Sequence, residues 1–189
     1  WCLSTATMLS LAAARAEVIP PHLSWTEDPQ TTATVLWQCD QPGRGTVWYG
    51  PTTNYGFSVS DPGGLRRHIL TLRGLQPGAM YHYKVLSDDG FETSDHTFWT
   101  APPPTGSVDF VVHGDLQGGL DEYWARTVVN SIVADNPQLV VHIGDMAIED
   151  PAYGVPGFST WGTFFNLATD ELENAVFMPT SGNHDDPAD

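Results

Sequence analysis

Basic residues are scarce in this chain of 189 residues. It has seven Lys and Arg against 23 Asp and Glu, which gives a formal net charge of -16 at pH 7. Nucleic acids are bound by cationic patches, so this charge balance excludes a nucleic-acid-binding surface. For the same reason, the chain could act on a phosphate group only with metal ions that offset the repulsion.

Long apolar runs are also missing. After the first few residues, none reaches the roughly 20 residues that a membrane helix requires. The start has the features of an incomplete export signal, since Cys2–Ala14 is apolar and small and Ala14-Arg15-Ala16 fits the A-x-A cleavage pattern. We expect residues 1–16 to be a partial signal peptide, and the mature protein to begin near Glu17 and to be secreted, periplasmic or extracellular. A buried amphipathic helix is the alternative for this segment.

Cysteine is limited to Cys2 and Cys39. Cys2 would leave with the signal, or would carry a lipid if the context upstream of it specified one. No internal disulfide is therefore expected in the mature chain. Cys39 alternates with Val35 and Trp37, which favours a buried strand thiol over a reactive one.

Residues 17–100 have the pattern of a β-sandwich. Short runs of β-branched and aromatic residues are separated by turn formers such as Gln76-Pro77-Gly78, and no helical periodicity exceeds a turn or two. The runs predict strands at Thr34–Cys39, Thr46–Tyr49, His68–Leu72, Tyr81–Leu86 and Thr97–Trp99. Three consecutive prolines then interrupt any helix or central strand, so we expect a linker at 101–107.

The segment Leu75–Val85 resembles the fibronectin type III pattern, in which a Leu and a Pro-Gly turn precede a corner tyrosine. The resemblance implies that Tyr81 is this tyrosine and that its hydroxyl bonds to nearby backbone, which is a structural role. Leu23-Ser24-Trp25 and Val35-Leu36-Trp37 look like early strands of the same domain. Trp37 is expected in the core.

Beyond the linker, residues 108–189 show strands that alternate with helices. We expect strands at Val108–His113, Leu139–Ile143 and Ala175–Met178, and helices at Asp121–Ala134 and Ser159–Leu172. This β-α-β-α-β series predicts a mostly parallel sheet covered by helices. The fold class is therefore multi-domain, a fibronectin type III-like β-sandwich followed by an α/β unit.

All three strands of the second unit end in residues of metal-ligand type. They run into His113-Gly114-Asp115, Gly144-Asp145 and Gly182-Asn183-His184-Asp185. Parallel sheets bind ligands beyond the carboxyl ends of their strands. Gly lets backbone approach closely, and Asp or Asn presents oxygen to a hard cation. A single Gly-Asp is more often a turn or a helix cap, but three such ends in succession indicate a metal site.

This ordered set resembles the opening motifs of the calcineurin-like metallophosphoesterases, and the preceding sandwich points to the purple acid phosphatase branch among them. The match covers nearly the whole chain after the signal. It implies that Asp115 binds a first metal, that Asp145 bridges two metals and that Asn183 binds the second. The implied cofactors are two divalent or mixed-valence ions, Fe, Zn or Mn. Two close cations share a water and lower its pKa, which supplies a hydroxide nucleophile.

Further roles also come from the resemblance. His184 would contact phosphate or donate a proton to the leaving alkoxide, Asp185 could orient His184, and Asp150 would support its loop. His113 and His142 lie within strands, where a core histidine bonded to a backbone partner is the better interpretation.

The chain departs from the family pattern at one position and lacks its later motifs. Purple members have a tyrosine three residues after the bridging Asp, and this chain has Ile148 there, so the coloured phenolate-to-iron bond should be absent. The remaining metal histidines of the family come from a lone His and a Gly-His-x-His motif, which would lie beyond Asp189. We therefore expect these 189 residues to hold the first half of the site and to be inactive alone.

The predicted function is metal-dependent hydrolysis of small-molecule phosphate esters by a metal-bridged hydroxide. One alternative is a noncatalytic secreted binding or adhesion protein, with the sandwich as its working module and a degenerate second unit. Another is a phosphodiesterase or nucleotidase of the same superfamily.

Overall fold

The computed structural model describes residues 18–116, 122–147 and 161–185. The predictions for the export signal, Ile148 and Asp150 fall outside these ranges. The elements are β1 (Ile19–Ser24), β2 (Thr32–Gly43), β3 (Gly45–Gly50), β4 (Phe57–Ser60), β5 (Leu65–Arg73), β6 (Met80–Ser87), β7 (His96–Trp99), β8 (Phe110–His113), α1 (Glu122–Asp135), β9 (Leu139–His142), α2 (Trp161–Leu167), α3 (Thr169–Asn174) and β10 (Val176–Pro179).

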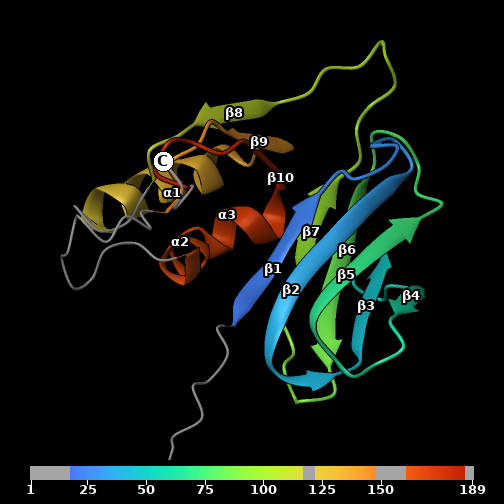
Figure 1. Ribbon diagram of the computed structural model, residues 1–189. Helices are drawn as coiled ribbons and strands as arrows, with labels where there is room; N and C mark the ends of the chain where they lie inside the picture. Colours follow the sequence, from blue (N-terminus) through green and yellow to red (C-terminus); the bar gives the residue numbers. More distant parts are fainter. Residues whose placement is uncertain (1–17, 117–121, 148–160, 186–189) are drawn as a thin grey trace, which may run out of the picture.

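The first seven strands form an antiparallel sandwich, in which β5-β2-β1 faces β4-β3-β6-β7 (Figure 1). The alternation along β2 explains the packing, because Val35, Trp37 and Cys39 are fully buried while Leu36 and Gln38 point to the other face. The predicted strands in this unit are confirmed, and Cys39 is a buried free thiol. The structure adds β4 and extends the first strand back to Ile19.

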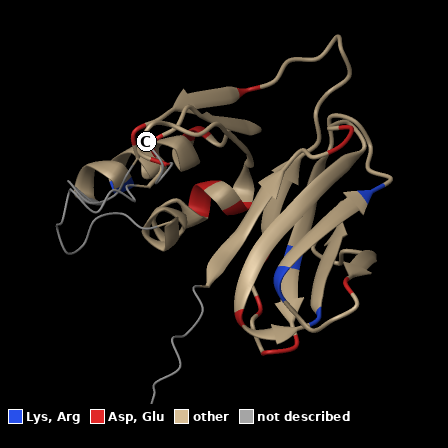
Figure 2. Cartoon of the chain, viewed as in Figure 1, with Lys and Arg blue, Asp and Glu red and all other residues tan. Residues whose placement is uncertain are grey.

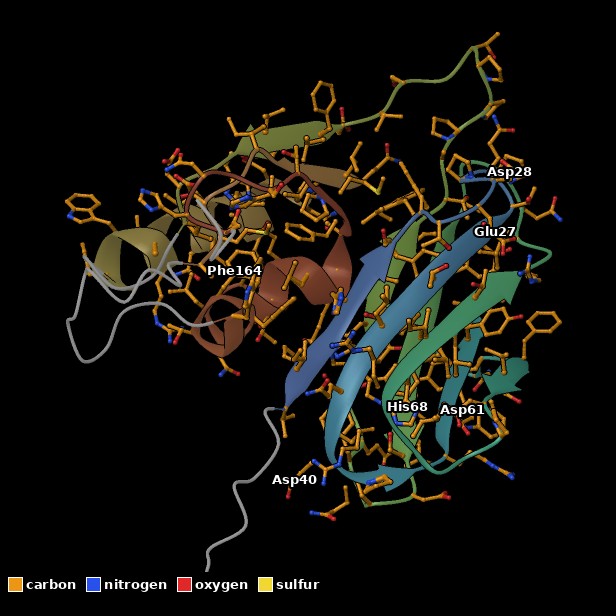
Figure 3. The ribbon with its side chains drawn as sticks, viewed as in Figure 1. Glu27, Asp28, Asp40, Asp61, His68 and Phe164 are labelled. Carbon is orange, nitrogen blue, oxygen red and sulfur yellow. The ribbon has the colours of Figure 1, made fainter. Side chains whose placement is uncertain are left out.

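Buried polar contacts hold the sandwich core in place. Trp37 stacks on His68 with ring centroids 4.6 Å apart, and His68 bonds to the Asp61 carboxylate at 2.5 Å (Figure 3). At the opposite corner, the hydroxyl of Tyr81 accepts a hydrogen bond from the backbone N–H of Gln76 at 3.0 Å. Tyr81 is thus the predicted corner tyrosine.

The second unit contains three parallel strands in the order β10-β9-β8. Val129 of α1, Phe164 of α2 and Leu172 of α3 pack in one hydrophobic core. Val140 of β9 and Phe177 of β10 belong to the same core. Together with the sandwich, this arrangement confirms the predicted fold class.

The single helix predicted at Ser159–Leu172 is wrong in one respect, because the structure breaks it into α2 and α3 at Ala168, whose ψ is 6°. The hydroxyl of Thr169 donates to the carbonyls of Phe165 and Asn166 at 2.8 and 3.2 Å. Such back-bonding from a Thr side chain bends helices, which accounts for the break.

One sheet joins the two parts of the chain. Strand β1 of the sandwich pairs in parallel with β10, and the six strands run in the order β5-β2-β1-β10-β9-β8. Helix α3 also contacts β7, where the His96 ring faces the Glu173 carboxylate at 3.6 Å, and Tyr83 of β6 donates to the Glu173 carbonyl at 2.8 Å. The division at 101–107 stays a prediction, and the β1–β10 pairing fixes the orientation of the second unit against the sandwich.

Among the residues that the structure describes, the helices pack on one face of strands β8 to β10 (Figure 1). On the other face Phe110, Val112 and Ile143 are each more than half exposed. No helix in the described ranges is long and apolar enough to cross a membrane.

Candidate metal centre

The carboxyl ends of β8, β9 and β10 meet at one edge of the sheet. Their register places His113 beside His142, and His142 beside Pro179. The backbone ladder continues one step further, because Ile143 N–H donates to the His113 carbonyl at 2.8 Å and Thr180 N–H to the His142 carbonyl at 2.9 Å. The three loops that follow therefore begin side by side, as expected for the carboxyl ends of parallel strands.

The two predicted aspartate ligands share an unusual backbone conformation. Asp115 has φ 55° and Asp145 has φ 57°, in the left-handed region that Asp tolerates better than most residues. The N–H of Asp115 donates to the Gly144 carbonyl at 3.0 Å, so the two loops are bonded directly. Strained conformations of this kind concentrate at functional sites, where the surrounding structure holds them.

The third loop lies directly against Asp145. The backbone N–H of His184 donates to Asp145 Oδ1 at 3.0 Å. A Cβ atom on Gly182 would lie 2.1 Å from the same oxygen, so only glycine permits this approach. The structure thus brings Asp145 together with the loop that carries Asn183 and His184.

The Asp185 carboxylate holds the second and third loops together. It is buried, and its carboxylate accepts four backbone N–H bonds of 2.7 to 2.9 Å: Oδ1 accepts from Met146 and Ala147, and Oδ2 from Asp145 and Gly182. The four bonds tie the second loop to the third. The predicted orientation of His184 by Asp185 stays a prediction, and the bonds that the structure shows position Asp145 instead.

A buried polar cluster lies beneath the loops, and its acidic member was not identified from the sequence. His113 Nε2 lies 3.0 Å from Glu171 Oε1 of α3, and the His113 and His142 rings meet edge to face with centroids 4.5 Å apart. The expected backbone partner is right for His142, whose Nδ1 accepts from the Gly144 N–H at 3.3 Å. It is wrong for His113, which pairs with a side chain.

Glu171 could have been found from the helical spacing of Phe164, Ala168 and Ala175, which are all buried and place position 171 on the same face. Burial lowers the pKa of His142 to about 4, and the nearby His113 adds to this effect. His142 is therefore neutral at ordinary pH, with Nδ1 free to accept the Gly144 N–H.

The donors at this edge fit a cation with oxygen ligands. Asp115 and Asn183 are exposed and Asp145 is half-buried, and together they offer two carboxylates and one amide oxygen. In the part of the chain that the structure describes, no group of three or more His, Cys, Asp or Glu side chains is arranged as a metal site. Figure 2 shows acidic segments on these loops, on α3 and at the ends of the sandwich, while the basic segments lie mainly on the sandwich.

The chain is similar in sequence to known acid phosphatases. Residues 19–101 match the family model described as Purple acid phosphatase, N-terminal domain. Acid phosphatase type 7 of Mus musculus is 28% identical over 195 residues, which cover 87% of this chain and 39% of the mouse protein.

Two solved structures share the fold. Purple acid phosphatase PPD1 from yellow lupin (Lupinus luteus) seeds has a TM-score of 0.67 at 21% identity, over 87% of this chain and 35% of the lupin chain. A structure of PhoD has a TM-score of 0.67 at 10% identity, over 91% of this chain and 40% of the PhoD chain. The chain spans less than half the length of each of these three proteins. It is a distant relative of the purple acid phosphatases.

Proposed function

We propose that this chain, as a distant relative of the purple acid phosphatases, carries part of a metal centre that hydrolyses phosphate esters of small molecules. Asp115 and Asn183 would each hold one cation, and Asp145 would bridge the pair. The observation that supports this most strongly is the contact between the loops after β8, β9 and β10, which gathers all the oxygen donors at one edge. The gathered negative charge favours cations over a phosphate alone.

When bound, the cation pair supplies a water of low pKa and offsets the negative charge of the phosphoryl group. The chain's own residues hold the Asp145 carboxylate in place and would supply a proton. The His184 N–H fixes one oxygen of Asp145, and Asp185 fixes the backbone of the same loop, so the bridging carboxylate is held in a single orientation. The His184 imidazole, carried by the third loop, would donate a proton to the leaving alkoxide oxygen.

The test uses the complete protein that contains this chain and p-nitrophenyl phosphate as substrate. We expect turnover that is lost with a chelator and restored by Mn²⁺, Zn²⁺ or Fe. Asp145→Asn should reduce kcat by about 10²–10³-fold, since a neutral amide cannot bridge two cations as a carboxylate does. Asp109→Asn is the matched control, because Asp109 is an exposed carboxylate just before β8, at the opposite edge of the sheet. Equal turnover in the two variants would refute the assignment of Asp145.

Mono- and diester activity are separated in the same assay with bis(p-nitrophenyl) phosphate. A preference for the monoester supports the phosphatase proposal. A preference for the diester would favour the phosphodiesterase alternative, and no hydrolysis of either ester would favour the noncatalytic alternative.

A further inference from the structure

A cavity lies between the sandwich and helix α2, apart from the candidate metal centre. Its volume is about 450 Å³, within the range of small-molecule sites. None of its lining residues belongs to the three loops that carry Asp115, Asp145 and Asn183.

The floor of this cavity is the outer face of β5-β2-β1. Strand pairing places two rows of three residues across it. One row is Arg67, Gln38 and Ile19, and the other is Ile69, Leu36 and His22. The residues alternate with the buried ones of β2, so their side chains all point away from the sandwich core. The floor therefore combines three aliphatic side chains with three polar ones, and the cation of Arg67 lies at one end.

Aromatic rings form the wall. Trp161 and Phe165 are four residues apart on α2, which places them on one face of the helix, and their ring centroids are 6.5 Å apart. Phe165 also lies against His22 of the floor, with centroids 5.1 Å apart. A planar ring could insert between this wall and the aliphatic floor residues, because aromatic pairs favour offset or tilted stacking at such separations.

Two polar groups define what such a ring would carry. The Nδ1 of His22 lies 3.2 Å from the Pro20 carbonyl, so Nδ1 bears the proton and Nε2 is an acceptor. Burial lowers the pKa of His22, the bond to Pro20 raises it and Arg67 lowers it, and the net direction is downward, which favours the neutral ring. Arg67 is exposed and has no ion-pair partner among the residues described. Its guanidinium matches a carboxylate in bidentate geometry.

We propose that this cavity, lined by Trp161, Phe165 and Arg67, binds a planar aromatic carboxylate, with the ring against the α2 wall and the carboxylate on Arg67. His22 Nε2 would accept a hydrogen bond from an N–H or O–H of the ligand. The guanidinium of Arg67 selects a carboxylate at this position, although the chain as a whole repels anions and has only seven Lys and Arg. Arg67 lies on β5, across the floor from the aromatic wall, and is a local exception to that repulsion.

The experiment titrates 2-naphthoate into the full chain at physiological salt and follows the indole N–H signals by two-dimensional NMR. We expect a saturable shift of the Trp161 signal with a Kd of about 1 mM or tighter, as suits a ligand of this size. The Trp124 signal is the internal control, because Trp124 of α1 is exposed and outside the cavity. Shifts of equal size at both tryptophans, or a Trp161 shift that does not saturate, would overturn the proposal.

Two comparisons test the part played by Arg67. Arg67→Gln should weaken binding by about 10-fold, the value of one charge-assisted hydrogen-bonded pair, while Arg66→Gln should leave it unchanged. Arg66 is the adjacent exposed residue of β5, and alternation points it to the other face. On the unmodified chain, 2-naphthalenemethanol should bind about 10-fold more weakly than 2-naphthoate. Arg66 and Arg67 are both exposed, so neither substitution should disturb the fold. Equal affinities in either comparison would overturn the assignment of Arg67.

Discussion

Substitution of Asp185 by Asn tests how the loops of the candidate metal centre are held. Each Asp185 carboxylate oxygen accepts two backbone N–H bonds, and the side chain is buried. Asn keeps one oxygen, so two buried amides would lose their acceptor and face an NH₂ group instead. Each unsatisfied buried donor costs about 1–3 kcal/mol, so the variant should lose about 3–4 kcal/mol of stability in these loops.

The assay is native-state hydrogen exchange of the full chain. We expect the amides of Asp145, Met146, Ala147 and Gly182 to exchange at least about 100-fold faster in Asp185→Asn, because the loss of free energy promotes local opening. Asp135→Asn, at the exposed end of α1, is the control and should change none of them. Unchanged exchange of these four amides in Asp185→Asn would refute the reasoning.

Further substitutions test other parts of the account. Gly182→Ala places a Cβ 2.1 Å from Asp145 Oδ1, so we expect the complete protein to lose metal and turnover. Ser181→Ala, at an exposed neighbouring position, is the control, and normal activity of Gly182→Ala would contradict the close approach. Burial, with Asp170 adding to it, raises the pKa of Glu173 to about 7. The stability that the protonated Glu173 carboxyl contributes is therefore fully present below pH 4.5 and is lost as the pH rises through 7. Glu173→Gln should therefore raise the free energy of unfolding by about 3 kcal/mol at pH 8 and by little at pH 4.5, measured by urea titration, and a gain that does not depend on pH would contradict this cause. For export, amino-terminal sequencing of the secreted protein should begin near Glu17, and an intact Trp1 would contradict it. For Ile148, the metal-loaded complete protein should lack an intense visible band, and a tyrosinate-to-iron band would contradict it.

Most of the secondary structure could be predicted because each element has a local pattern. The buried alternation of Val35, Trp37 and Cys39 predicts β2 without any tertiary information. Strand β4 was missed because Phe57–Ser60 is a short edge strand whose residues are mostly exposed, so it has no buried alternation. The break at Ala168 was missed because it depends on where one Thr hydroxyl donates its hydrogen bond.

Pairings between distant segments could not be predicted from local patterns. The parallel contact between β1 and β10 joins residues about 150 positions apart, and nothing in either strand specifies the other. The same limit applies to the site. The motifs predicted which loops meet, because carboxyl ends of parallel strands share an edge, but the bonds of Asp185 to four amides and of Glu171 to His113 depend on the folded backbone.

The central claim is that Asp145 holds two cations while His184 acts on the substrate. The measurement that tests it most directly is elemental analysis of the purified complete protein, with turnover measured on the same samples. We predict two metal ions per chain in the unmodified protein, loss of both metals and of activity in Asp145→Asn, and retained metals with slowed turnover in His184→Ala. Equal metal loss in the two variants, or full metal content in Asp145→Asn, would contradict the account.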